Sequence, residues 1–451
     1  MTRFGRSVSG ISGFLLLGLL GCPCIGLAGQ VSSGLQEVQM AFDSGKFEET
    51  LKLVEPLIHS KADPKKISRY KMLSLARLGK TQEGVEEYDR LNREMGHEDE
   101  ALLRELAIQS ILPLRTDMRE QMRGAAYTAL KEVDSEDVIS FAETGLSDGS
   151  GMIRVLVAEI LGKYPKGIRS SYFKGALKDS AALVRSTVLK GLARSGDKSY
   201  IPVIRPFLKD EQGVVQVTAA GALFMLGESQ HWDRIQQATD VPDGYERGAA
   251  FKILGELGDP RALPLLEKGL LDRQPSIRAA AVAALGNLGL PEAVPILVGV
   301  LADPRPPVRS VAAVTMGKLE SEEAVRALTR TLNDRDDGVK IAAVAGLLQL
   351  NSPFSVVADT VQQLMGDKNP GLRSSVAKAL GHGFGRDVVK LLILMLNDPI
   401  PKPRITAARS LGRIGGREVI PVLKRTLRDS DVAVKATAAG AIARILTPPK
   451  S

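Results

Sequence analysis

The charged residues with the most regular spacing in this chain form pairs six positions apart. An Asp is followed by an Arg or a Lys, and this basic position recurs at one constant interval from Arg123 to Lys340, takes a slightly longer step to Arg373, and continues to Lys435. An Asp in a turn can accept N–H groups at the start of the next helix, and a guanidinium can bind its carboxylate through two donors. We therefore expect a structural ladder of ion pairs rather than a functional charge stripe. The expected members are Asp148, Arg154, Asp179, Arg185, Asp210, Asp272, Arg278, Asp303, Arg309, Asp334, Lys340, Asp367, Arg373, Asp398, Arg404, Asp429 and Lys435.

Two defects in this pattern indicate how the ladder is wired. Gln216 replaces the basic residue in one unit, and Val241 replaces the acid in the next unit. If each basic residue pairs with the Asp of the following unit, these defects combine into one missing rung. We therefore predict pairing between units, for example Arg185 with Asp210.

Residue types for catalytic or metal chemistry are sparse and scattered. The histidines do not form pairs at the spacing of metal ligands, and the only cysteines, Cys22 and Cys24, lie near the N-terminus. A disulfide framework, a cysteine-based zinc site or a cysteine nucleophile is therefore not expected in the body of the chain. Glycine-rich stretches lack the Lys and hydroxyl residue of a phosphate loop. We expect a non-catalytic protein with no cofactor and no small-molecule substrate. The histidines are His59, His97, His231 and His382.

The segment 1–28 has the pattern of a signal peptide. Arg3 and Arg6 precede the apolar stretch Ile11 to Leu20, which is too short to span a bilayer comfortably. Two processing sites compete: a lipobox-like sequence would be lipidated at Cys22, whereas ordinary cleavage would follow Ala28. An uncleaved anchor is the third alternative. We expect an exported protein, periplasmic or anchored to the envelope, with possible membrane attachment through a lipid on Cys22.

The composition favours an elongated array of small helices over a large-cored enzyme. The chain has 451 residues, of which only 4% are aromatic. Its net charge is +8, but basic and acidic residues are interspersed and no polybasic run is present. Such a chain is attracted only mildly to anionic surfaces, so nucleic acid is not the expected partner.

Each repeat unit has the pattern of two helices separated by a polar turn. Pro295 and Pro421 lie near the start of a first helix, and Pro307 and Pro403 mark the start of a second one. Eleven units share this register. The second helix is followed by a Gly, which we expect to close it in the left-handed conformation. These glycines are Gly162, Gly255, Gly286, Gly317, Gly381 and Gly412.

Segments such as Asp272 to Gly286 and Asp303 to Gly317 resemble HEAT repeats of the short type first described in phycobilin lyases. The resemblance implies an all-α fold, an α-solenoid of about eleven HEAT-like helical hairpins at residues 111–447 with a short tail at 448–451. In HEAT proteins the equivalent charged pair is associated with a ladder inside the solenoid. Scaffolds, transport receptors, a few lyases and some nucleic-acid enzymes share this repeat, so it is weak evidence for function.

The second helix of each unit provides the candidate binding surface. Positions three, four and six after the basic residue, such as Ala281, Val282 and Ala284, should be core. Positions one and five should face outward, on the side that is concave in HEAT proteins. We expect a shallow apolar centre with a basic rim that binds a protein or peptide, although small residues can also simply suit tight curvature. The candidates are Lys190, Lys252, Ala279, Ala283, Ser310, Val314, Ile341, Ala345, Lys378 and Arg409.

Residues 29–110 fall outside the register of these units. Gly45 and Gly79 lie in similar surroundings, and their separation and the apolar pattern around them resemble tetratricopeptide repeats. The small residue usual five positions after the turn glycine is Thr50 in one copy and Gly84 in the other. The alternative is a generic helical cap for the first HEAT-like unit.

These patterns favour a protein–protein interaction scaffold of the cell envelope. The first alternative is a bilin-lyase-like or chaperone-like accessory subunit, which the leader argues against. The second is a nucleic-acid-binding HEAT protein, whose binding would weaken steeply with salt. A longer loop is expected near Asn351, where the interval between units widens.

Overall fold

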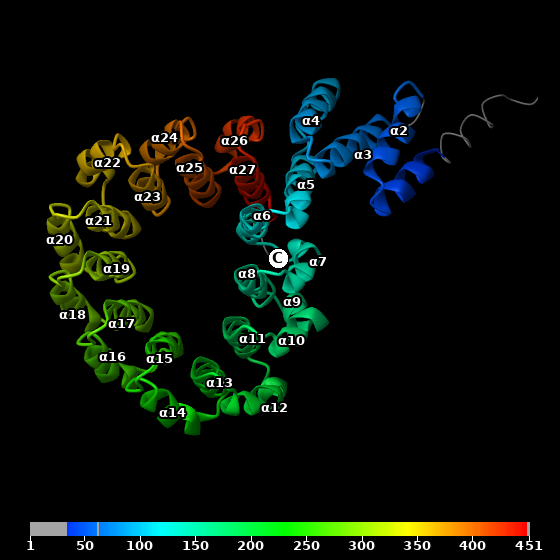
Figure 1. Cartoon of the computed structure of the whole chain (residues 1–451). Helices are drawn as coiled ribbons and strands as arrows, with labels where there is room; N and C mark the ends of the chain where they lie inside the picture. Colours follow the sequence, from blue (N-terminus) through cyan, green and yellow to red (C-terminus); the bar gives the residue numbers. More distant parts are fainter. Residues whose placement is uncertain (1–33, 61–62, 449–451) are drawn as a thin grey trace, which may run out of the picture.

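The computed structural model describes residues 34–60 and 63–448, and these residues form helices, turns and loops without a strand. The helices are arranged as an α-solenoid, which confirms the predicted all-α fold (Figure 1). No helix within the described residues is long and apolar enough to cross a membrane. Cys22, the leader 1–28 and the end of the tail, 449–451, lie outside the described residues.

Each hairpin places one helix on the inside of the solenoid and its partner, or shorter helical pieces, on the outside (Figure 1). The inner helices are α6 (Glu120–Val133), α8 (Gly151–Leu161), α11 (Ala182–Arg194), α13 (Gly213–Met225), α15 (Gly244–Leu257), α17 (Pro275–Leu288), α19 (Pro306–Met316), α21 (Asp337–Gln349), α23 (Pro370–Leu380), α25 (Pro401–Ile414) and α27 (Val432–Ile445). The outer helices include α7 (Ile139–Ala142), α9 (Pro165–Arg169), α10 (Ser171–Gly175), α12 (Ile201–Ile204), α14 (Trp232–Gln237), α16 (Leu263–Gly269), α18 (Ala293–Val300), α20 (Glu322–Thr331), α22 (Ala358–Met365), α24 (Arg386–Met395) and α26 (Ile420–Thr426).

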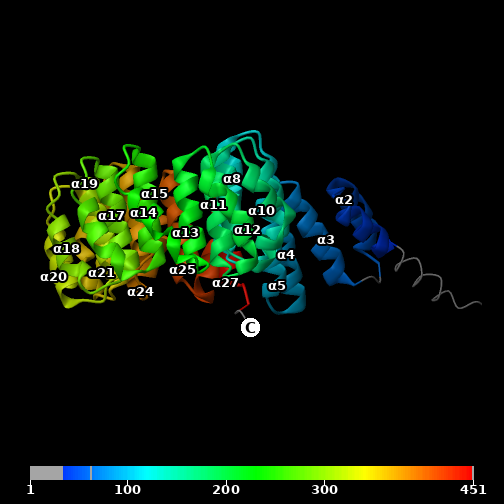
Figure 2. The ribbon, with the colours of Figure 1, turned by 90° about the horizontal axis from the view of Figure 1, so that it is seen from below.

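The solenoid closes into a ring, a feature that the sequence pattern did not predict. The last inner helix, α27, packs against the first, α6, and also against α5 (Glu100–Ile111) (Figure 1). Residues 436–443 of α27 are all buried, whereas the last helix of an open array has one face in solvent. In the perpendicular view, the inner helices run side by side roughly along the axis of the ring (Figure 2). The two ends of the repeat array therefore cover each other.

The glycines expected to end the inner helices have another role, so that prediction was wrong. Gly162 follows α8 with a φ of −67°, and Gly255 lies within α15. A Cβ on Gly255 would stand 2.6 Å from the Cα of Ala284 in α17, so the missing side chain allows neighbouring inner helices to touch. The left-handed conformation falls three residues later, at Gly258, where φ is 66°.

Substitution of Gly255 by Ala should destabilise the protein by about 1 to 3 kcal/mol, because the added Cβ meets the backbone of α17 and cannot be relieved by a side-chain rotation. The matched control is Gly175→Ala in α10, where an added Cβ meets nothing within 4 Å. We expect a lower urea midpoint for Gly255→Ala only. Equal midpoints for the two variants would contradict the proposed close helix contact.

The N-terminal helices pack in antiparallel pairs. Gly45 and Gly79 each have a φ of 77° in the turns between paired helices. Thr50 is buried, and a Cβ on Gly84 would stand 3.0 Å from the carbonyl oxygen of Met72. Both small residues therefore lie where helices meet, while the tetratricopeptide resemblance stays a prediction. The boundary placed after residue 110 falls at the end of α5. The helices are 34–43, α2 (Phe47–Val54), α3 (Pro64–Arg77), α4 (Thr81–Met95) and α5.

Candidate functional site

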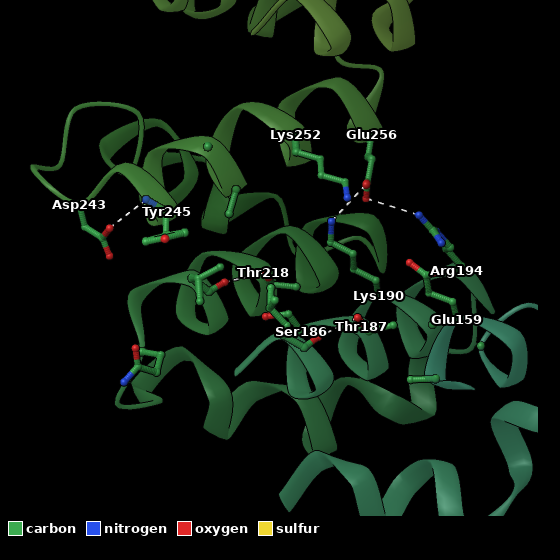
Figure 3. Close-up of a pocket in the computed structure, with 18 residues that line it drawn as sticks. Glu159, Ser186, Thr187, Lys190, Arg194, Thr218, Asp243, Tyr245, Lys252 and Glu256 are labelled. Carbon is green, nitrogen blue, oxygen red and sulfur yellow. Dashed lines mark hydrogen bonds and ion pairs between the residues drawn. The ribbon is translucent and has the colours of Figure 1, made fainter. Parts of the chain in front are cut away.

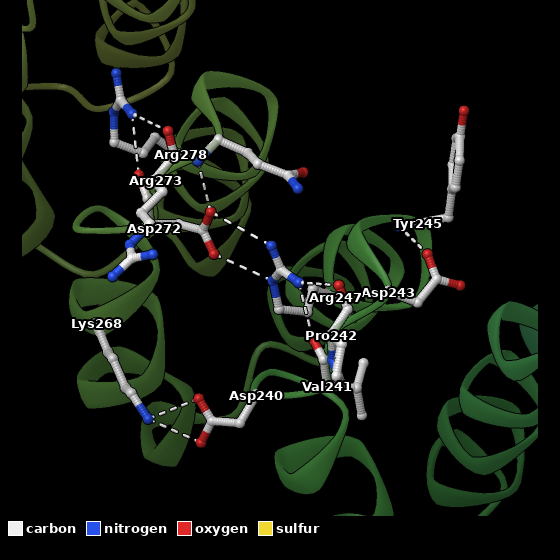
Figure 4. A network of polar contacts seen from close by, with 11 residues as sticks. Asp240, Val241, Pro242, Asp243, Tyr245, Arg247, Lys268, Asp272, Arg273 and Arg278 are labelled. Atoms are coloured by element: carbon white, nitrogen blue, oxygen red, sulfur yellow. Dashed lines mark hydrogen bonds and ion pairs between the residues drawn. The ribbon is translucent and has the colours of Figure 1, made fainter.

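The charged ladder runs between consecutive units, as predicted. The Nε and Nη2 atoms of Arg278 donate to the two carboxylate oxygens of Asp303 at 2.7 and 2.9 Å. Its Nη1 donates to the carbonyl of Asp272 at 2.9 Å, and the Asp303 carboxylate also accepts the N–H of Arg305 at 2.8 Å. Figure 4 shows the neighbouring rung between Arg247 and Asp272. Rungs of this kind join Arg123–Asp148, Arg154–Asp179, Arg185–Asp210, Arg247–Asp272, Arg278–Asp303, Arg309–Asp334, Arg373–Asp398 and Arg404–Asp429.

These rungs make stability sensitive to acid. The hydrogen bond from Arg278 holds the pKa of Asp303 below its usual range, and Arg309 does the same for the pKa of Asp334. A folded-state pKa below the unfolded value of about 3.9 gives stabilisation that is complete at higher pH and is lost as the pH falls through the folded value. The urea midpoint should therefore stay level down to about pH 5 and fall below about pH 4. A midpoint that rises on acidification would contradict this account.

Two rungs are missing, where the sequence had indicated one. At the expected gap, Gln216 donates to the carbonyl of Asp210 at 2.7 Å and accepts from Arg234 of the outer helix α14 at 3.1 Å. Arg234 also donates to Glu246 at 2.6 Å. A polar contact from the outer layer therefore replaces the Arg–Asp rung at this unit.

The second missing rung lies at Lys340, which was expected to pair with Asp367. Lys340 instead binds Asp337, one turn away, at 2.9 Å. Every rung that forms joins residues 25 apart in the sequence, whereas the insertion near Asn351 separates Lys340 from Asp367 by two more positions. A lysine also lacks the two-donor fork of an arginine. Within the described residues, the two ends of the ladder are also without rungs. Lys435, in the last inner helix, forms no ion pair within the described part of the chain. Asp117, in the first unit, pairs with Arg119.

Most of the predicted concave residues line the inside of the ring, but two do not. Ile341 and Ala345 of α21 are each only 5% exposed, so their assignment to the binding surface was wrong. The expected core positions Ala281, Val282 and Ala284 are buried, which confirms that register. Ala279, Ala283, Ser310 and Val314 are partly exposed, Lys252 and Lys378 are exposed, and Lys190 and Arg409 are partly buried.

The burial that excludes Ile341 and Ala345 of α21 from the binding surface recurs in two other inner helices. Helices α13, α21 and α27 are the inner helices that lack an arginine in the ladder position, and all three are buried on the side expected to face inward. The first position after the ladder residue is Val217, Ile341 or Ala436, and each is buried. The missing arginine in the ladder position was the sequence feature that could have identified these three helices.

Helix α13 is set back from the inner face, farther from the centre of the ring than α11 and α15 on either side (Figure 1). Across it, the Nζ of Lys190 on α11 donates to Glu256 on α15 at 3.1 Å, and Arg194 approaches the same carboxylate at 3.7 Å. Burial lowers the pKa of Lys190, despite this carboxylate. Arg409 on α25 similarly lies 3.7 Å from Glu132 on α6, across α27.

A groove of about 530 Å³ lies over α13 between α11 and α15 (Figure 3). Leu183 and Tyr245, which are 56% and 87% exposed, line one end of it. The charged side chains of Lys190, Lys252 and Glu256 line the other end, as Figure 3 shows. The groove therefore has exposed apolar side chains at one end, beside the carboxylate of Asp243, and a cluster of charged side chains at the other. Between these ends lie Ser186, Thr187, Thr218 and Ala249.

The ring closure is reinforced by ion pairs between the two ends of the array. Lys424 of α26 contacts Asp89 and Glu98, each at 2.9 Å, and Arg428 contacts Asp89 at 3.1 Å. Arg417 lies 2.8 Å from Glu100. Basic side chains of the last unit thus meet acidic side chains of the N-terminal helices. This charge complementarity stabilises the closed form at moderate ionic strength.

The described residues contain no group of three or more His, Cys, Asp and Glu side chains that could hold a metal ion.

Comparison with known proteins finds the HEAT-repeat family model at residues 233–317, 271–349 and 388–451. None of the curated proteins matches the sequence.

Three solved structures are similar at low identity. Human deoxyhypusine hydroxylase in complex with glycerol is 21% identical, covering 56% of this chain and 98% of its own, with a TM-score of 0.30. The Escherichia coli protein YibA is 17% identical, covering 59% and 98%, with a TM-score of 0.34. The complex of CpcE and CpcF of phycocyanin lyase from Nostoc sp. PCC7120 is 21% identical, covering 49% and 94%, with a TM-score of 0.35. The chain thus contains HEAT repeats within a helical solenoid.

Proposed function

We propose that this protein is a non-catalytic scaffold that holds a segment of a partner polypeptide against the inside of its ring. The observation that carries the proposal is the groove over α13, which combines exposed apolar side chains with cations on the inner face. HEAT solenoids offer extended concave surfaces of this kind for binding. Because the ring is closed, the partner contributes an extended or helical segment that enters along the ring axis.

Photo-cross-linking in the native host tests this proposal. A photoreactive amino acid at Val314, on the inner helix α19, should capture one discrete polypeptide. The matched position is Arg326, which is 61% exposed on the outer helix α20 and should capture no such polypeptide. Equal capture at both positions, or capture at Arg326 alone, would refute binding on the inner face.

We also propose that the protein is exported and held at the cell envelope, with lipidation at Cys22. The support is the charged and apolar pattern of residues 1–28 and the lipobox-like sequence that ends at Cys22. Metabolic labelling with a radioactive fatty acid should mark the wild-type protein in the membrane fraction, and Cys22→Ala should abolish the label. An unlabelled, full-length wild-type protein in the cytoplasm would contradict both parts of this proposal.

A further inference from the structure

The charged end of the α13 groove carries more positive than negative charge. Lys190 and Arg194 both approach Glu256, and Lys252 forms no ion pair or hydrogen bond within residues 34–60 and 63–448. Glu159, which also lines the groove, is already paired with Lys131 at 2.5 Å. Two cations therefore share the carboxylate of Glu256 and Lys252 has no acidic partner among the described residues, which leaves this end of the groove able to accept an anionic group.

The opposite end of the groove has the surface expected of a hydrophobic anchor site. Leu183 on α11 and Tyr245 on α15 are exposed on either side of α13, and Val214 lies between them. Large apolar side chains that stand exposed on a concave surface commonly mark an interaction site. On the floor of the groove, the hydroxyl of Ser186 is buried and has no hydrogen-bond partner in the described residues.

The distance between the two ends sets the spacing of groups in a ligand. Leu183 and Lys190 are seven residues apart on α11, and Tyr245 and Lys252 are seven apart on α15. At a rise of 1.5 Å per residue, each apolar side chain lies about 10 Å along the helix from its cation. An extended peptide covers that distance in about three residues. The two ends can therefore be occupied together by one short segment.

We propose that the groove over α13 binds an acidic polypeptide segment, with an apolar side chain against Leu183 and Tyr245 and a carboxylate about three residues away against Lys252 and Arg194. This inference rests on the proposed function that the inner face holds a polypeptide, and it specifies the chemistry of that segment. Charge complementarity selects the carboxylate, and the exposed apolar pair selects its anchor.

The groove suits a peptide better than a nucleic acid. A polynucleotide places a phosphate on every residue, so its neighbouring phosphates would approach the carboxylates of Glu159, Asp243 and Glu256, which all line the groove. Among the described residues that line this groove, Tyr245 is the single aromatic one, whereas single-stranded nucleic acids are held by series of aromatic side chains on which the bases stack.

Fluorescence anisotropy with the full-length protein tests the inference. The probe is a labelled peptide, AFSADD, in which a Phe is followed three positions later by two Asp residues. We expect AFSADD to bind, and both AFSANN, without the charges, and AASADD, without the anchor, to bind about tenfold more weakly. Lys252→Glu should weaken binding of AFSADD by about tenfold. The control Lys174→Glu, which reverses an exposed cation on the outer helix α10, should leave binding unchanged.

Several outcomes would overturn the inference. These are equal binding of AFSADD and AFSANN, equal effects of Lys252→Glu and Lys174→Glu, failure of AFSADD to bind, and tighter binding of a deoxythymidine oligomer than of AFSADD.

Failure of the inference can be told apart from failure of the scaffold function. If a photoreactive group at Val314 captures a partner polypeptide but one at Tyr245 does not, the scaffold stands and this groove is not its docking site.

Discussion

Replacing Arg309 by Leu is expected to destabilise the protein by about 3 to 5 kcal/mol, the range for removing one partner of a buried charge pair. Arg309 is only 4% exposed and donates two hydrogen bonds to Asp334, at 2.9 and 2.8 Å. It also donates to the carbonyl of Asp303 at 2.9 Å. The substitution leaves a largely buried carboxylate and a carbonyl without their donor. A lower midpoint in urea unfolding, followed by far-ultraviolet circular dichroism, measures this loss.

The matched control is Lys340→Leu, at the same position of the repeat in α21. Lys340 makes no rung, and its one ion pair among the described residues is with Asp337, which is 39% exposed on the same helix. Its removal should cost less than about 1 kcal/mol, the value of an exposed ion pair. A similar cost for the two substitutions would show that the ladder contributes little beyond surface electrostatics.

Replacing Gly440 by Leu is expected to open the ring. A Cβ at this position of α27 would stand 2.8 Å from the carbonyl oxygen of Ala129 in α6, so a larger side chain forces the two helices apart. No chain connection joins α27 to α6, and the seam is free to separate without unfolding either helix. Small-angle X-ray scattering should show a larger radius of gyration, with helical content preserved.

The control for Gly440→Leu is Gly299→Leu in the outer helix α18, where an added Cβ meets nothing within 4 Å. This variant should keep the wild-type radius of gyration. Added salt should widen the difference for Gly440→Leu, because it screens the ion pairs of Lys424 and Arg428 at the seam. An unchanged radius for Gly440→Leu at all salt concentrations would argue against a seam at this contact.

The sequence was sufficient to predict the repeat, the core positions and the direction of ladder pairing. Each depends on a local rule that every unit repeats, so the defects at Gln216 and Val241 can be assigned to a single rung from the sequence alone. The missing rung at Lys340 was not predicted, although the extra residues near Asn351 were visible. This rung is lost because the side chain of Lys340 does not reach Asp367, whose turn is displaced by the extra residues.

Ring closure could not be predicted, because it depends on small rotations between units that add up around the whole array. Ala129, which Gly440 meets, and Ala441, which Gly412 meets, both lie six residues after the ladder position, and a single repeat cannot reveal that its last copy meets its first. The groove was missed for a related reason. The sequence identified Lys190 and Lys252, but not that α13 is set back between them.

Zero-length carbodiimide cross-linking of the monomeric wild-type protein tests the closed ring most directly. Lys424 lies 2.9 Å from Asp89 and from Glu98, more than three hundred residues earlier in the chain, whereas Lys190 and Glu256, at 3.1 Å, report only on two units separated by α13. The closed ring predicts both cross-links in the mass spectrum of the monomer fraction. A Lys190–Glu256 cross-link without any link from Lys424 to Asp89 or Glu98 would show that the solenoid is open.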